Sequence, residues 1–237
     1  MNDSISGKKP YYTICVNIHN KPCVVVGGGE VARRKVASLN DAGGRVTVIS
    51  PKLESVLEYM AFQKEIQWKK EEFQLSDLDG AYLVVAATDN RDVNHQIGEI
   101  CRKREILCNV VDAPEEGSFI VPSSIERGLL TIAISTSGIS PSLASSIRQE
   151  LEMAYGEEYG MFLELASLLR SKVIEMFPTQ QKRQLIFDRM VSSRALSLLR
   201  NGMVEEAHKE LDEIIIEASR SVIEMHEDSL PIINHAK

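Results

Sequence analysis

The sequence lacks several features that would place it in common classes of protein. Its 237 residues contain no run of 18 apolar residues, so we expect no membrane-spanning segment. The N-terminus has no charged stretch followed by an apolar core, which argues against a secretory signal peptide. The net charge is −7, so the chain lacks the positive balance of general nucleic-acid-binding proteins.

Cysteine is also scarce. The four cysteines are widely spread and none forms a CxxC pair, so the sequence suggests neither a zinc site nor a disulfide framework. The five histidines show no metal-ligand spacing, and we predict no metal site. Apolar residues make up 43% and charged residues 26% of the chain, which is ordinary globular usage. These features together predict a cytoplasmic protein with reduced thiols.

The most informative segment runs from Val24 to Ala32, with the sequence VVVGGGEVA. A β-branched run enters a glycine turn, and the turn opens into a helix, which is the context of a dinucleotide fingerprint. Gly27 allows the tight turn, Gly29 allows a pyrophosphate to approach the backbone, and Ala32 takes the small position where helix and strand meet. The alternative is a glycine-rich strand exit that binds no ligand.

Strands and helices alternate after this motif. Further strands are predicted at residues 45–49, 66–69, 81–87 and 107–111. The run 81–87 is apolar almost throughout, as expected of a buried parallel strand. A helix is predicted over 92–105, with Asp92 as its N-cap. This alternation predicts an α/β fold with an open parallel sheet.

The composition changes after residue 112. Two strands are predicted at 118–121 and 129–135, and from about residue 141 apolar residues recur at helical spacing. The last residues, from about 226, are predicted to be disordered. The chain is therefore predicted to have three parts, namely a Rossmann-like domain over 1–112, a small segment with strands over 113–145 and a helical domain over 146–237.

Five segments carry a resemblance to a known family. In chain order they are VVVGGGEVARRK, VTVISP, YLVVAATDNRDVN, CNVVDAPEEGSFIVPS and ISTSGISPSLASSIRQE. Together they resemble the siroheme synthase family, which includes precorrin-2 dehydrogenases and sirohydrochlorin ferrochelatases. The segments NVVDAPEEGSF and STSGISPSLA are far more specific than the glycine turn. Fused members carry a methyltransferase domain after this unit, so this short chain resembles the free-standing form.

The resemblance implies a reaction in which precorrin-2 loses a hydride to NAD, and a proton, to give sirohydrochlorin. Some members then insert ferrous iron, and the sequence leaves that activity open. The resemblance also implies a homodimer with residues 113–145 as dimerisation segment, which agrees with the need of two isolated strands for a partner sheet. The alternative is a dinucleotide-sensing module without catalysis, which Asp112 and the segment STSGISPSLA do not fit.

Asp112 is the predicted catalytic residue. It follows the fifth strand at the carboxyl edge of the sheet, where open α/β sheets place their ligands. The resemblance makes it the family's catalytic aspartate in the NVVD motif, able to act as a general base. The alternative is that Asp112 only caps the turn before Pro114.

The resemblance also supplies cofactor positions after the glycines and after the second strand. Thr88 and Asp89 end the fourth strand and are predicted to line the nicotinamide side, and the alternative is that they only cap the following helix. A typical NAD site has an acidic residue after the second strand, whereas this chain has Ser50-Pro51-Lys52. Lys52 would tolerate a 2′-phosphate, so the residues alone leave NADP open, while the resemblance favours NAD. The predicted cofactor-binding residues are Gly27, Gly28, Gly29, Glu30, Val31, Pro51, Lys52, Thr88 and Asp89.

Overall fold

The computed structural model describes residues 11–227, which fold into two compact units. The first unit holds the chain up to Val121 together with Ser137–Ser140. The second unit holds Pro122–Thr136 and the chain from Pro141 onward. The disorder predicted at the end of the chain concerns residues outside the described range, apart from 226 and 227 in the last helix.

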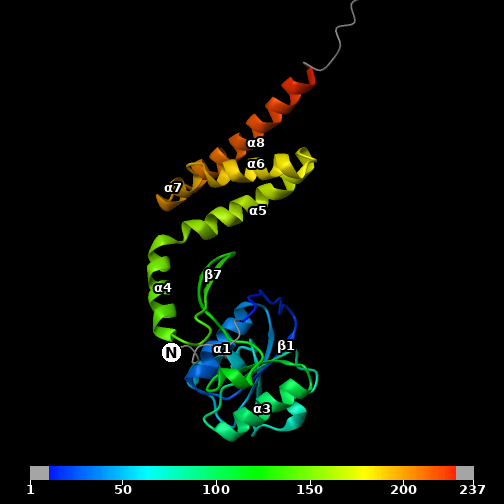
Figure 1. The fold of residues 1–237 in the computed structure, drawn as a ribbon, viewed down its shortest axis with the longest axis vertical. Helices are drawn as coiled ribbons and strands as arrows, with labels where there is room; N and C mark the ends of the chain where they lie inside the picture. Colours follow the sequence, from blue (N-terminus) through cyan, green and yellow to red (C-terminus); the bar gives the residue numbers. More distant parts are fainter. Residues whose placement is uncertain (1–10, 228–237) are drawn as a thin grey trace, which may run out of the picture. The chain divides into compact units, whose positions relative to one another are not determined.

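The first unit is built on a five-stranded parallel sheet (Figure 1). Its strands are β1 (Pro22–Val26), β2 (Arg45–Ile49), β3 (Gln67–Lys69), β4 (Leu83–Ala86) and β5 (Leu107–Val110). The elements between and after them include α1 (Glu30–Asp41), α2 (Ser55–Phe62), α3 (Arg91–Lys103) and the 3₁₀ turns η1 (Leu75–Leu78) and η2 (Pro114–Glu116). The predicted α/β fold with a Rossmann-like sheet is confirmed.

The central strands send their side chains alternately into two hydrophobic clusters. Val25 of β1 packs in one cluster with Val36 of α1 and Leu57 of α2. Val26 packs in the other cluster, which includes Ile97 of α3. Both faces of β1 and β4 are therefore covered, which explains why these strands are apolar without interruption.

The strand order determines where a ligand can bind. The order β3-β2-β1-β4-β5 means that the chain builds outward from β1 to β3 and then returns to the other side of β1. Open α/β sheets bind ligands at this reversal, beyond the carboxyl ends of the strands.

Two helix ends differ in how well the sequence predicts them. Glycine marks the end of α1, because Gly43, two residues after the helix, has φ +75° and its N–H donates to the Asn40 carbonyl at 2.8 Å. The prediction that Asp92 is the N-cap of the helix after β4 is wrong. Asn90 is the N-cap of α3, because its side-chain oxygen accepts hydrogen bonds from the N–H groups of Asp92 and Val93.

The second unit combines an antiparallel hairpin with helices. Its elements are β6 (Ser123–Arg127), β7 (Leu130–Ile134), α4 (Pro141–Ala154), α5 (Glu158–Met176), α6 (Gln180–Val191), α7 (Ala195–Arg200) and α8 (Val204–Glu227). Buried apolar side chains from α5 to α8 form one core, with Leu211 and Ile215 of α8 fully buried. No helix within residues 11–227 has both the length and the apolar character needed to cross a bilayer.

The strand predicted over residues 118–121 is wrong. This segment stays beside β5, because the Ser118 N–H donates to the Cys108 carbonyl at 2.8 Å and Asn109 Nδ2 donates to the Phe119 carbonyl at 3.2 Å. The strand that pairs with β7 is β6, which begins at Ser123. The three-part division of the chain stays a prediction, and the compact units place the hairpin with the helices.

Candidate functional site

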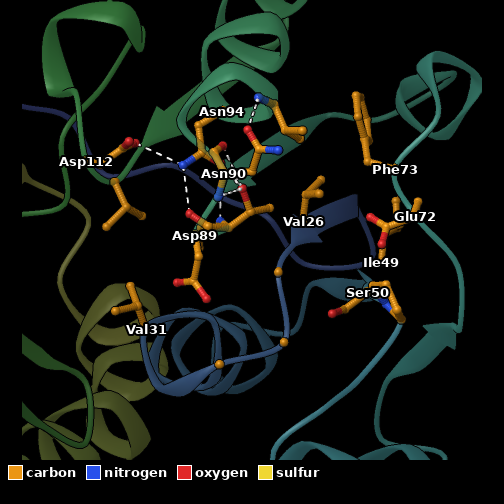
Figure 2. Close-up of a pocket in the computed structure, with 18 of the residues that line it drawn as sticks. Val26, Val31, Ile49, Ser50, Glu72, Phe73, Asp89, Asn90, Asn94 and Asp112 are labelled. Atoms are coloured by element: carbon orange, nitrogen blue, oxygen red, sulfur yellow. Dashed lines mark hydrogen bonds between the residues drawn. The ribbon is translucent and has the colours of Figure 1, made fainter.

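A pocket of about 480 Å³ lies at the carboxyl edge of the parallel sheet (Figure 2). Its volume falls in the range of small-molecule sites. Residues at or after the ends of β1, β2, β4 and β5 line it, and the loop after β3 contributes as well. The predicted site residues that line this pocket are Gly27, Gly28, Gly29, Glu30, Val31, Pro51, Thr88, Asp89 and Asp112.

Lys52 is not among the lining residues. Its backbone carbonyl accepts a hydrogen bond from the Ser50 hydroxyl at 2.7 Å, and it also approaches Gly28 closely. The structure therefore gives Lys52 a part in the turn, through its backbone, and does not bring its side chain together with the other predicted residues.

The three glycines of the turn have different reasons for being glycine. Gly27 has φ +123°, and a Cβ there would lie 2.2 Å from the Ala87 carbonyl oxygen. A Cβ on Gly28 would lie 2.0 Å from the Lys52 carbonyl oxygen. A Cβ on Gly29 would meet nothing within 4 Å. The first two glycines are required by the fold, whereas the third leaves open space that a ligand can use.

The start of α1 supplies hydrogen-bond donors beside this space. Gly29 is the N-cap and has no side-chain cap, and the Arg33 N–H donates to the Gly29 carbonyl at 2.9 Å. The amides of Glu30, Val31 and Ala32 precede that bond, so they lack an intrahelical acceptor. Free amides at the positive end of a helix dipole bind phosphate groups. The turn and helix therefore fit the pyrophosphate of a dinucleotide.

Glu30 places a carboxylate at the same helix end. Arg33 donates two hydrogen bonds to it, at 2.9 and 2.6 Å, and these lower the pKa of Glu30. Arg33 Nε also lies 3.2 Å from Glu54 Oε1. The arginine thus offsets the negative charge that Glu30 would present to an approaching phosphate.

The opposite end of the pocket is organised by Asn94, which is buried. Its side-chain oxygen accepts hydrogen bonds from the Thr88 N–H at 3.2 Å and from Thr88 Oγ1 at 2.7 Å. Its side-chain nitrogen donates to the Thr88 carbonyl at 2.9 Å and to Asp112 Oδ1 at 3.1 Å. A backbone N–H can only donate, so Thr88 fixes which end of the amide is oxygen and which end faces Asp112.

A second group of charges lies beside Asp112. Arg91 Nε is 3.6 Å from Asp112 Oδ2, and the guanidinium also binds both carboxylate oxygens of Glu116. His95 Nδ1 lies 3.0 Å from Glu116 Oε1. The hydrogen bonds from Arg91 lower the pKa of Glu116 to about 2, with a smaller contribution from His95. Glu116 therefore holds Arg91 next to the predicted catalytic carboxylate.

Sequence reasoning missed three of the polar lining residues, Asn90, Asn94 and Glu72. The two asparagines had a signal, because both stand in the polar run after the fourth strand, within TDNRDVN. Glu72 had none, because it lies three residues beyond the short strand β3. Within the part of the chain that the structure describes, no group of three or more His, Cys, Asp or Glu residues is placed to hold a metal ion.

Three family models match the chain in succession. A model described as putative NAD(P)-binding matches residues 14–123, and one described as the central part of sirohaem biosynthesis proteins matches residues 127–153. A third, the sirohaem synthase dimerisation region, matches residues 158–215. The chain belongs to the siroheme synthase family. The resemblance seen in the sequence is therefore confirmed. The dimerisation model falls on helices α5 to α8, and not on residues 113–145, where the sequence predicts the dimerisation segment.

Individual siroheme synthases are similar over most of this chain. Siroheme synthase 1 of Aeromonas salmonicida is 41% identical over 186 residues, which cover 78% of this chain and 40% of the relative. The siroheme synthase of Photorhabdus laumondii is 37% identical over 203 residues, which cover 86% of this chain and 43% of the relative. The chain thus spans less than half the length of these curated relatives.

A solved structure has the same fold. SirC, a precorrin-2 dehydrogenase, matches with a TM-score of 0.71 at 22% sequence identity. The match covers 86% of this chain and 100% of that chain. At this identity the likeness establishes the fold alone.

Gly28 and Gly29 provide a matched pair of substitutions. Gly28→Ala forces a Cβ against the Lys52 carbonyl, so we expect a loss of stability of about 1–3 kcal/mol, as for other overpacked sites. Gly29→Val has open space and should unfold at the parent's temperature, but its side chain should severely weaken dinucleotide binding. Thermal unfolding and NAD titration of both variants check this. Parent-like NAD binding by Gly29→Val would mean that the pyrophosphate does not lie at this turn.

The Arg91–Glu116 pair should make the stability of the folded chain depend on pH. Because the pKa of Glu116 is lower in the folded chain than the value of about 4.3 for a free glutamate, the pair stabilises the fold fully above that pH. The stabilisation is lost as the pH falls towards 2. In Arg91→Ala we expect the pKa of Glu116 to rise and the acid-dependent loss of stability to shrink, measured by NMR titration and by unfolding at two pH values.

Arg102→Ala is the control for this experiment, because Arg102 donates to the Glu116 backbone carbonyl at 3.1 Å and not to its carboxylate. The Glu116 titration should stay unchanged in this variant. An equal shift in both variants would show that Arg91 is not the main cause of the low pKa.

Proposed function

We propose that this chain oxidises precorrin-2 to sirohydrochlorin with NAD as the hydride acceptor. The observation that carries the proposal is the position of Asp112, which lines the same pocket as the glycine turn. Membership of the siroheme synthase family supports the reaction, and the solved structure of the same fold is named as a precorrin-2 dehydrogenase.

The strand order gives the cofactor a direction. In doubly wound sheets the adenosine half binds over the first strands and the nicotinamide half binds beyond the point where the order reverses. Here the adenosine would lie towards β2 and β3, and the nicotinamide towards β4 and β5. Thr88 and Asp89 follow β4 and Asp112 follows β5, so the reacting end of the cofactor would lie beside them.

The reaction removes a hydride and a proton from precorrin-2. Bound NAD would accept the hydride, and the chain's own residues would have to handle the proton. Asp112 is a suitable acceptor, since its side chain is 39% exposed and reachable from the pocket. Asn94 donates to Oδ1 and so fixes the rotation of the carboxylate, while Oδ2 lies nearer to Arg91. Thr88 in turn holds Asn94, so the base is positioned by two layers of hydrogen bonds.

The alternative of a dinucleotide-sensing module is not favoured. A sensor requires the glycine turn, but it has no need of a carboxylate held in place at the nicotinamide end of the same pocket. Ferrous iron insertion rests on the family resemblance alone and stays a prediction. A cytoplasmic location likewise stays a prediction.

Asp112→Asn tests the proposed base. The amide keeps the size of the side chain but cannot accept the proton, so we expect turnover to fall by about 10²–10⁴-fold. The NAD dissociation constant should change little, because the pyrophosphate site is at the other end of the pocket. The assay follows sirohydrochlorin absorbance and reduced nicotinamide fluorescence together.

Asp92→Asn is the matched control, since Asp92 lies on α3 and does not line the pocket. It should turn over like the parent. Near-normal turnover by Asp112→Asn would remove Asp112 from the mechanism, and an unchanged substrate spectrum with the parent protein and NAD would favour the sensing module.

We also propose that the chain forms a homodimer. The match to a dimerisation region over residues 158–215 supports this, as do large apolar side chains that are exposed in a single copy. Leu168 of α5 is 72% exposed and Leu185 of α6 is 63% exposed. Light scattering at micromolar concentration should give twice the 26.4 kDa mass of the chain, and a monomer would overturn the proposal.

A further inference from the structure

The adenosine end of the pocket carries one negative side chain. Ile49 and Ser50 at the end of β2 and Glu72 and Phe73 after β3 line this end, and Figure 2 labels them together on one side of the site. Asp112, Asp89 and Asn94 are labelled on the other side. Glu72 therefore lies where the cofactor's adenosine would bind, away from the proposed base.

The usual carboxylate of an NAD site is missing at the end of β2. Dinucleotide folds commonly place an acidic residue there to accept the ribose 2′-hydroxyl hydrogen bond. This chain has Ser50, Pro51 and Lys52 at that point, and the Lys52 side chain does not line the pocket. Among the lining residues contributed by β2 and by the loops after β2 and β3, Glu72 is the charged one.

The fold brings Glu72 to this place by pairing β3 with β2. Ile49 is in register with Lys69, and the Ser50 N–H donates to the Lys69 carbonyl at 3.2 Å. The Trp68 indole N–H donates to the Ser50 carbonyl at 2.9 Å. The end of β3 is thus fastened to the end of β2, so the loop that follows β3 borders the same end of the pocket.

The neighbouring carboxylates already have partners. Lys69 forms ion pairs with Glu71 and with Asp77. No ion pair within the described residues involves Glu72, whose side chain is exposed. Glu72 is therefore the carboxylate on this loop that is available to a ligand.

We propose that Glu72 selects NAD over NADP. Its carboxylate accepts a hydrogen bond from the adenosine ribose 2′-hydroxyl and repels the 2′-phosphate of NADP. The acidic group that most such folds carry at the end of β2 is here supplied from beyond β3. This inference rests on the dinucleotide binding in the proposed function and adds the basis of its specificity.

The test compares the Kd values of NAD and NADP, read from the fluorescence of the single tryptophan, Trp68, at low salt. The parent should prefer NAD. In Glu72→Gln, which keeps a hydrogen-bond acceptor but removes the charge, the ratio of the NADP Kd to the NAD Kd should fall about tenfold. In Glu72→Arg the preference should reverse, because the guanidinium binds phosphate.

Two control variants isolate the residue. Glu71→Gln removes the adjacent carboxylate, which is paired with Lys69, and should leave the ratio unchanged. Lys52→Gln should also leave it unchanged. A parent that prefers NADP, together with selective loss of NADP binding in Lys52→Gln, would overturn the inference and make Lys52 the phosphate partner.

The remaining outcomes separate this inference from the proposed function. If the parent binds NAD but Glu72→Gln keeps the parent's ratio, the role of Glu72 is wrong and the proposed function stands. If the folded parent binds neither dinucleotide, both the role of Glu72 and the proposed NAD-dependent reaction are overturned.

Discussion

The side-chain amide of the buried Asn94 makes the hydrogen bonds on which the end of the pocket around Asp112 depends. It joins the end of β4, the first turns of α3 and the end of β5 through hydrogen bonds to Thr88 and Asp112. A buried amide without these partners would be costly, so the three elements are held in one arrangement. The orientation of the Asp112 carboxylate is set by its hydrogen bond from Asn94, which Thr88 holds in place. A catalytic assignment based on Asp112 alone would miss the residue that orients it.

The charges around the pocket show how the site handles an anionic ligand. The charged side chains that line it are all acidic, namely Glu30, Glu72, Asp89 and Asp112. Phosphate binding must therefore rest on the backbone amides at the start of α1, since the lining supplies no lysine or arginine. Arg33 and Arg91 are not among the lining residues and are paired with Glu30 and Glu116. Arg33 thus holds Glu30 at the electropositive start of α1, while Arg91 holds Glu116 and lies 3.6 Å from Asp112.

Much of the first unit could be predicted because its signals are local. Val24–Val26 and the run 81–87 are apolar because both faces of the sheet are covered, and glycine marks the turns. The strand at 118–121 failed because Ser118 and Phe119 bond to Cys108 and Asn109 of β5, a tertiary pairing that the pattern of residue types does not reveal. Glu72 was missed because its position depends on the pairing of β2 with β3. Gly28 was assigned to the cofactor, whereas its closest constraint is the Lys52 carbonyl of the fold itself.

The division of the chain between its two units has a consequence for folding during synthesis. The first unit includes Ser137–Ser140, which the chain reaches only after it has built the β6–β7 hairpin of the second unit. Neither unit is one uninterrupted stretch of sequence. The nucleotide-binding unit therefore cannot be completed on the ribosome until the hairpin has also emerged. A single cut in the backbone after Val121 would leave residues 137–140 covalently attached to the second unit and severed from the rest of the first unit.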